Sequence, residues 1–148
     1  MSTLDRAISI ASNAHKDQVD KAGSPYILHP LRVMFQVASV EEQIVAVLHD
    51  TLEDSSVTLD DLRQEGFSTH ILEALTCLTK IPGESYDQFI SRVMPNSLAR
   101  QVKIADIQDN MNLSRLPAIA DKDLERLRKY HRALKTLIGA EEGSHEMR

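Results

Sequence analysis

Apolar residues recur at intervals of three or four along almost the whole chain, and this spacing constrains the fold more than any other feature. Near the N-terminus Ala7 and Ala11 follow Leu4, and near the C-terminus Leu127 follows Leu124. Such intervals place side chains on one face of an α-helix. No segment shows sustained alternation of apolar and polar residues, which is typical of a half-buried strand. The sequence therefore predicts an all-α fold.

Start and stop signals divide this pattern into about eight helices packed as a compact bundle. The expected helices begin, in chain order, near Ser2, Pro30, Ser39, Thr58, Ser68, Ser85, Asn96 and Asp121. The third is expected to run unbroken through Asp54. Residues 16–28 contain Gly and Pro and little periodicity, so they are expected to form a loop, and the tail from Gly139 is expected to be frayed.

Length and charge limit the classes of function. The 148 residues fit one domain spanning 1–148, and the net charge of −5, from 17 basic and 22 acidic residues, argues against a general nucleic-acid binder. No apolar run approaches the ~18 residues that span a membrane, and no secretory signal opens the chain. We expect a cytoplasmic protein with a small-molecule partner, and no nucleic-acid or membrane partner; the oligomeric state stays open.

One stretch, AVLHDTLED at residues 46–54, joins an apolar run to a cluster of charge. On a continuous helix, His49 and Asp50 project about 100° apart, and both reach an atom lying in front of the helix. A metal ion is such an atom. Glu53 and Asp54 lie one turn further on, where a carboxylate can contact a water molecule beside the same ion. The alternative is an exposed C-terminal turn, where the helix dipole disfavours acids.

Two other segments carry ligand-type residues in unusual company. His29 precedes Pro30 at an expected helix N-terminus, and Asp106 interrupts a helix that is otherwise apolar. A buried carboxylate without a partner costs several kcal/mol. Asp106 is therefore expected to meet a metal or another cation.

These segments resemble one family. The sequence is similar to the HD-domain metal-dependent phosphohydrolases, and specifically to the hydrolase domain of RelA/SpoT-type alarmone enzymes, from about residue 15 to residue 116. The segments that carry the resemblance are DQVDKAGSPYILHP, HPLRV, LHDTLED, LTK and VKIADIQDN. The resemblance implies a compact HD-domain bundle that acts as an enzyme.

The resemblance also implies a metal ion held by four residues: His29, His49, Asp50 and Asp106. Two imidazoles and two carboxylates form a mixed nitrogen and oxygen set, which suits Mn²⁺ better than an ion that prefers thiolates. The family commonly uses manganese, so the resemblance implies one Mn²⁺ or a similar divalent ion.

The implied reaction is removal of the 3′-pyrophosphate from guanosine 3′,5′-bis(diphosphate), ppGpp, or from its pentaphosphate. Glu53 and Asp54 would orient the attacking water or move its proton. Lys21 and Asn110 match positions that contact the nucleotide in the family. Metal-dependent hydrolysis of a small nucleotide is therefore the first hypothesis.

Four further side chains receive supporting roles. Lys80 and Lys103 either neutralise phosphate charge or lie solvated on the surface. His15 matches a family histidine and is expected to pack beside the site without binding the metal. Tyr26 is expected to pack under the loop.

Two departures from the family weaken the guanine assignment. Asp20 precedes Lys21 where alarmone hydrolases usually carry a basic pair, and residues 111–114 lack the basic residue often found in that turn. Two alternatives therefore stay open. One is an HD-type phosphohydrolase that acts on another nucleotide or phosphate ester. The other is a non-catalytic nucleotide-binding module, which loss of the metal ligands or of the Glu53–Asp54 pair would favour.

Overall fold

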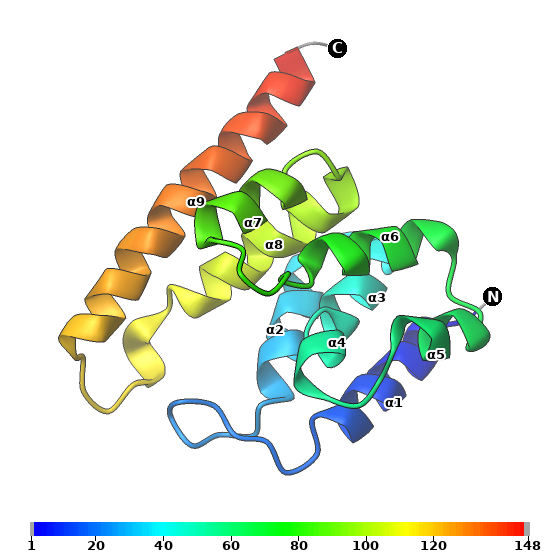
Figure 1. Cartoon of the computed structure of the whole chain (residues 1–148). Coiled ribbons are helices and arrows are strands. Elements are labelled where there is room, and N and C mark those ends of the chain that lie inside the picture. Colours follow the sequence, from blue (N-terminus) through cyan, green and yellow to red (C-terminus); the bar gives the residue numbers. More distant parts are fainter. Residues whose placement is uncertain (1, 147–148) are drawn as a thin grey trace.

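The computed structural model describes residues 2–146, which form nine α-helices and one 3-10 helix, with no β-strand in that range (Figure 1). The elements are α1 (Leu4–Ala14), α2 (Leu28–Gln36), α3 (Val40–Leu48), α4 (Thr51–Asp54), α5 (Leu59–Gln64), α6 (Thr69–Leu78), α7 (Tyr86–Val93), α8 (Ser97–Asn110), η1 (Leu113–Arg115) and α9 (Asp121–Glu146). The predicted all-α class is confirmed. None of the helices in residues 2–146 combines the length and apolarity needed to cross a membrane.

Most helices begin where their capping residues predict. Ser39 and Ser85 each form a capping box with the residue three positions later, so two backbone donors are satisfied reciprocally at each helix start. Thr58 does the same at α5. Asn96 accepts a hydrogen bond from the Ala99 N–H at the start of α8.

The prediction of one continuous third helix through Asp54 is wrong. The helix ends at Leu48, His49 and Asp50 form a turn, and the short α4 follows. Side chains occupy the last carbonyls of α3: His49 Nδ1 donates to the Ala46 oxygen, and the Thr51 hydroxyl donates to the Leu48 oxygen at 2.8 Å. Local side-chain hydrogen bonds of this kind replace helical backbone bonds.

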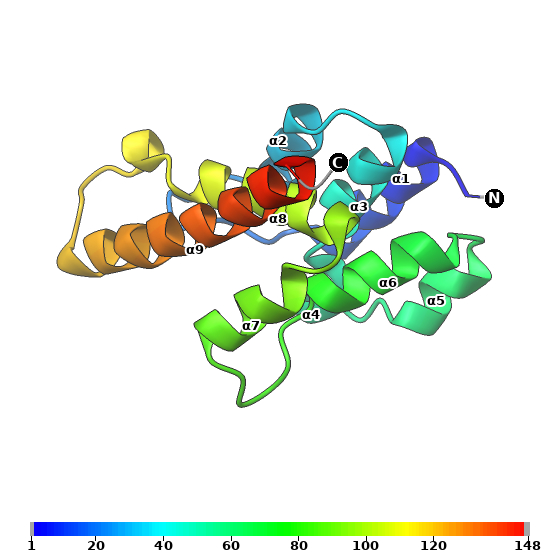
Figure 2. The same cartoon turned by 90° about the horizontal axis from the view of Figure 1, so that it is seen from above.

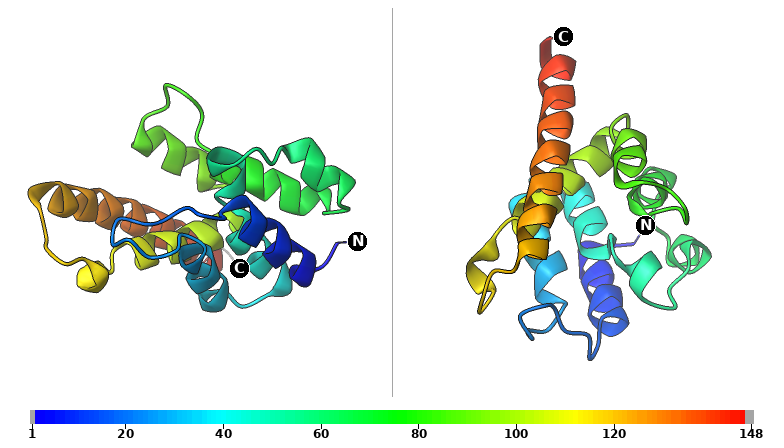
Figure 3. Two further views of the ribbon diagram at one scale, coloured as in Figure 1. Left: turned by 90° about the horizontal axis from the view of Figure 1, so that it is seen from below. Right: turned by 60° about the vertical axis from the view of Figure 1, so that its left-hand side comes forward.

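The C-terminal segment also differs from expectation. Helix α9 continues past Gly139 to Glu146, where the sequence predicts a frayed tail. Glu141 accounts for part of this order, because its carboxylate lies 3.1 Å from Nε of Arg100 in α8. The ion pair holds the C-terminal part of α9 against α8. The end of α9 projects beyond the other helices (Figure 3).

Helix α3 lies at the centre of the molecule and packs against α1, α2, α6 and α8 (Figure 2). Its residues 45–48 are completely buried, which explains why this segment is apolar on all sides. Helices α2, α3 and α8 also pack against one another. Their mutual contact brings together the start of α2, the end of α3 and the middle of α8.

Leu75 offers a test of this core. Its side chain is fully buried in α6, and a Leu→Ala change removes buried methyl groups and leaves a cavity. We expect Leu75→Ala to lower the free energy of unfolding by about 2–5 kcal/mol in urea titrations. Leu124→Ala, at a leucine of α9 that is 42% exposed, is the matched control and should cost less than ~1 kcal/mol. Equal losses for the two variants would contradict the packing described above.

Candidate metal centre and nucleotide cavity

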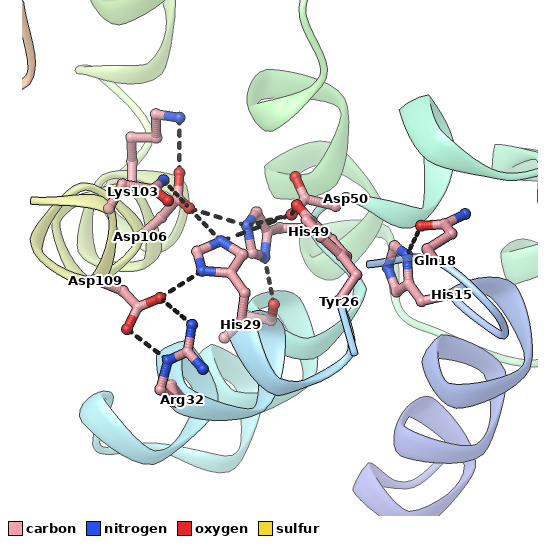
Figure 4. A network of polar contacts seen from close by, with 12 residues as sticks. His15, Gln18, Tyr26, His29, Arg32, His49, Asp50, Lys103, Asp106 and Asp109 are labelled. Atoms are coloured by element: carbon pink, nitrogen blue, oxygen red, sulfur yellow. Dashed lines mark hydrogen bonds and ion pairs between the residues drawn. The ribbon is translucent and has the colours of Figure 1, made fainter. Parts of the chain in front are cut away.

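The three packed helices bring together the four expected metal ligands (Figure 4). His29 lies at the start of α2, and Asp106 lies within α8. His49 and Asp50 follow α3 directly. Ligand atoms of His29, His49 and Asp50 all lie within 4.8 Å of one another. This group of two imidazoles and a carboxylate is able to hold a divalent metal ion.

Asp106 approaches the same imidazoles from the other side (Figure 4). Its Oδ1 lies 2.8 Å from Nε2 of His29 and 3.3 Å from Nε2 of His49. Asp50 Oδ2 lies 3.1 Å from Nε2 of His49 and 3.8 Å from Nε2 of His29. Both imidazole Nε2 atoms therefore face carboxylate oxygens of two different segments.

The outer nitrogen of each histidine is already committed. Nδ1 of His49 donates to the backbone oxygen of Ala46, which can only accept. Nδ1 of His29 lies 2.6 Å from Oδ2 of Asp109. Although burial raises the pKa of Asp109, the hydrogen bonds from His29 and Arg32 hold this pKa well below its usual range. Both rings thus carry hydrogen on Nδ1, which leaves the Nε2 lone pairs directed at the carboxylates.

This arrangement requires a positive charge among the four side chains. Two Nε2 lone pairs facing carboxylate oxygens repel them unless a proton or a metal ion lies between. Burial alone would lower the pKa of His49, but Asp50 and Asp106 raise it well above its usual value. Burial likewise opposes ionisation of Asp50, yet His49 lowers the pKa of Asp50 to about 2. The residues present therefore fit a cation, and their mixed nitrogen and oxygen donors fit a divalent ion.

Lys103 is not a solvated surface lysine. Its side chain is 13% exposed, and Nζ lies 2.8 Å from Oδ2 of Asp106 and 4.9 Å from the centre of the Phe89 ring. Burial disfavours the charged amine, but the Asp106 carboxylate raises the pKa of Lys103 and keeps it charged. Asp106 therefore offers one oxygen to the imidazoles while Lys103 neutralises the other.

Tyr26 does more than pack under the loop. Its hydroxyl donates to Oδ2 of Asp50 at 2.6 Å, the same oxygen that faces the imidazoles. Its ring lies 5.0 Å from that of the buried His15, centre to centre. His15 in turn contacts Gln18, whose amide donates to the backbone oxygen of Asp54 at 2.8 Å. These contacts connect the loop before α2 to the segment that carries the acids.

Glu53 and Asp54 lie in α4 and not on the helix that precedes His49. Both acids lie in a helix of one turn, of which Asp54 is the last residue. Glu53 is exposed and accepts a hydrogen bond from the Lys80 backbone N–H. Burial, then Asp50 and then Glu53 raise the pKa of Asp54.

Asp109 and Arg32 are parts of the site that the sequence motifs did not assign. The buried Asp109 carboxylate joins His29 to the Arg32 guanidinium, which donates to it from Nε at 2.8 Å and from Nη2 at 3.0 Å. The signal was available in the spacing. Arg32 follows His29 by three residues and Asp109 follows Asp106 by three, and on packed helices such positions share a face.

A cavity of about 340 Å³ lies beside His29 and Asp109. Lys21 and Asn110, the two expected substrate contacts, both line it. Asn110 also lies near the metal ligands, with Nδ2 3.3 Å from Oδ1 of Asp106. Further lining residues, which the sequence motifs did not assign to the substrate, are Tyr26, Arg32, Leu113, Arg115, Arg126, Leu127 and Tyr130. Three aspartates, Asp20, Asp109 and Asp123, also line it. The cavity thus offers apolar and aromatic groups together with four cationic side chains, a combination that suits a nucleotide.

The structure gives a role to Asp20 and supplies a basic residue near 111–114, the two places where the sequence departs from alarmone hydrolases. Asp20 Oδ1 accepts hydrogen bonds from the N–H groups of Ala22 and Ser24, at 2.9 and 3.0 Å, so this carboxylate organises the turn of the loop. The basic residue absent from residues 111–114 has a counterpart one position later. Arg115 lines the cavity and donates to the backbone oxygen of Asp109 at 3.2 Å.

No family model matches the sequence. Comparison with individual known proteins, however, finds relatives that include enzymes named for ppGpp hydrolysis or synthesis. The guanosine-3′,5′-bis(diphosphate) 3′-pyrophosphohydrolase of Aquifex aeolicus is 32% identical over 120 residues, which are 73% of this chain and 17% of that protein. A probable GTP pyrophosphokinase of Mycobacterium leprae is 30% identical over 127 residues, covering 78% of this chain and 16% of that protein. The bifunctional (p)ppGpp synthase/hydrolase SpoT of Escherichia coli is 28% identical over 123 residues, or 73% of this chain and 17% of that protein. The chain thus spans less than a fifth of each of these relatives.

A solved structure shares the fold, and it belongs to a protein described as "A metazoan ortholog of SpoT hydrolyzes ppGpp and plays a role in starvation responses". The match has a TM-score of 0.76 and covers 93% of this chain and 86% of that one, at 17% sequence identity. Sequence and fold together identify the chain as a RelA/SpoT-like hydrolase domain.

Proposed function

We propose that the chain is a metal-dependent pyrophosphohydrolase that removes the 3′-pyrophosphate from ppGpp or its pentaphosphate. One observation carries the proposal: a buried histidine–carboxylate cluster that requires a cation directly adjoins a cavity lined by cationic and aromatic side chains. The names of the relatives support the choice of reaction, because several of them are 3′-pyrophosphohydrolases of guanosine 3′,5′-bis(diphosphate).

The metal would be held by His29, His49, Asp50 and Asp106. We favour Mn²⁺, because imidazole and carboxylate donors without a thiolate suit this ion. When bound, such an ion lowers the pKa of water and polarises a phosphoryl oxygen. The Tyr26 hydroxyl and Asp109 would orient Asp50 and His29 for this role, since outer partners of this kind set the position of metal ligands.

The reaction breaks the bond between the 3′ oxygen and its phosphorus. The oxygen of water joins that phosphorus, pyrophosphate leaves, and the nucleoside keeps its 5′-diphosphate and regains a 3′ hydroxyl. We assign proton acceptance to Asp54, because burial and the nearby Asp50 raise its pKa above that of an ordinary carboxylate and so make it the stronger base. Glu53, held by the Lys80 N–H, would orient the attacking water.

The cavity would hold the nucleoside and its 5′ phosphates. Arg126 pairs with Asp123 at 3.4 Å and lies at the cavity wall with Lys21, so both cations lie within reach of a polyanion. Tyr130 and Leu127 supply flat and apolar surface for a base. Asp20 replaces the basic residue that alarmone hydrolases usually carry, which weakens the argument for guanine. A nucleotide with another base is therefore the second candidate substrate.

A substrate screen tests the proposed function directly. The purified protein loaded with Mn²⁺ is incubated with ppGpp, with its adenine analogue, with GTP and with p-nitrophenyl phosphate, and pyrophosphate and phosphate are quantified. We expect pyrophosphate release from the 3′-diphosphates and none from GTP. Faster turnover of the adenine compound would favour the second candidate. Turnover of p-nitrophenyl phosphate alone, or of no compound, would contradict the proposal.

Asp106→Asn tests the metal site, because it keeps the shape of the side chain and removes its charge. We expect Mn²⁺ affinity to fall by ~100-fold or more in calorimetric titrations, and hydrolysis to be nearly abolished, because a ligand is lost. Asp87→Asn is the matched control, since Asp87 is exposed and pairs with Arg132, which is not a metal ligand. Wild-type affinity in Asp106→Asn would remove Asp106 from the ligand set.

Glu53→Gln tests the role of this acid. The amide keeps an oxygen for the Lys80 N–H but loses the negative charge, so we expect kcat to fall by ~100-fold while Mn²⁺ content stays unchanged. Steady-state kinetics with elemental analysis measure both quantities. An unchanged kcat with a raised KM would instead assign Glu53 to substrate binding.

A further inference from the structure

Arg92, in α7, closes the end of α6 and the loop that follows it. Its Nη1 donates to the backbone oxygens of Thr76 and Cys77 at 3.3 and 3.1 Å, and its Nη2 donates to that of Thr79 at 2.8 Å. Thr76 and Cys77 lie in the last turn of the helix, where the Thr76 oxygen also accepts from the Thr79 N–H, and Thr79 is the residue that caps the helix. The same guanidinium donates to Glu84 from Nε at 2.9 Å and from Nη2 at 3.0 Å.

Glu84 closes the other end of this loop, residues 79–84. Its Oε1 accepts hydrogen bonds from the Ile81 N–H at 3.1 Å and from Arg92 Nη2, and its Oε2 accepts from Arg92 Nε. The Glu84 side chain is 10% exposed, and hydrogen bonds from Arg92 and then from Ile81 lower its pKa to about 2. A single ion pair therefore fixes both ends of the loop that turns at Gly83, where φ is +84°.

The loop has one contact with the acids of the site. The Lys80 N–H points to Oε1 of Glu53, and among the described side chains this is the one hydrogen bond that the Glu53 carboxylate makes. Glu53 itself is exposed, so neighbouring side chains restrain it little. The direction of this carboxylate thus depends on where the loop holds the Lys80 amide.

We propose that Arg92 and Glu84 are positioning residues that set Glu53 through the 79–84 loop. This rests on the proposed role of Glu53 in hydrolysis. Neither side chain takes part in the metal cluster or lines the nucleotide cavity. Their effect is therefore on the chemical step, and substrate and metal binding are left unchanged.

The geometry requires arginine and not merely a positive charge. One planar guanidinium serves three carbonyl oxygens and two carboxylate oxygens from a single position. A lysine has one nitrogen and cannot span this set. Arg92→Lys should therefore keep the charge and lose most of the positioning.

The test compares Arg92→Ala and Arg92→Lys with the wild type, each alone and combined with Glu53→Gln. We expect Arg92→Ala to lower kcat by ~10- to 100-fold, with KM and Mn²⁺ content changed by less than ~2-fold, and Arg92→Lys to lower kcat nearly as much. In the Glu53→Gln background, Arg92→Ala should lower kcat by less than a further ~2-fold, because residues that act through one another are not additive. Arg132→Ala is the matched control, since Arg132 makes an exposed pair with Asp87, and it should leave kcat unchanged.

A second measurement does not depend on activity. The Lys80 amide signal in ¹H–¹⁵N spectra should move in Glu53→Gln, and it should move in the same direction in Arg92→Ala, because both changes weaken its bond to the carboxylate. The proposal would be overturned if Arg92→Ala lowered kcat by as large a factor in the Glu53→Gln background as it does in the wild type. An unmoved Lys80 signal in a folded Arg92 variant would also overturn it. An inactive wild type would instead contradict the proposed function, and the Lys80 signal would still decide the positioning claim.

Discussion

Two buried imidazoles that face one buried and one half-buried carboxylate are the feature on which the rest of the site depends. The Nε2 atoms of His29 and His49 lie 2.8 and 3.3 Å from the same oxygen of Asp106, and both have Nδ1 committed elsewhere. Such a set is stable only with positive charge at its centre. The cost of burying it would be unnecessary in a domain that only had to fold, which is why the cluster indicates a function.

The surrounding structure serves this cluster. The break after Leu48 directs His49 and Asp50 out of α3, and it needs the side-chain hydrogen bonds to the last carbonyls of that helix. Lys103 neutralises the far oxygen of Asp106, and Asp109 connects His29 to Arg32. Tyr26 joins the cavity loop to Asp50, so the same loop contacts both the proposed nucleotide cavity and a proposed metal ligand.

The sequence predicted what depends on local pattern. Helical periodicity and capping residues place nearly every helix, and the oddity of a carboxylate in an apolar helix points to Asp106. The break at His49–Asp50 could not be predicted, because the pattern continues through it and the decisive hydrogen bonds involve side-chain rotamers. The roles of Lys103, Tyr26 and Asp20 depend on contacts with particular neighbours, which residue type does not specify. The arginines of the cavity come from α2, η1 and α9, and only the folded arrangement brings them together.

The central claim is that one divalent ion occupies the space among His29, His49, Asp50 and Asp106. Anomalous diffraction from crystals grown with Mn²⁺ tests it most directly, because the signal locates the ion without assumptions about activity. We expect one strong peak per chain, in contact with both Nε2 atoms and with an oxygen of each carboxylate. A peak that lies elsewhere, or a cluster in which the imidazoles stay hydrogen-bonded to the carboxylates in the presence of saturating Mn²⁺, would contradict the claim.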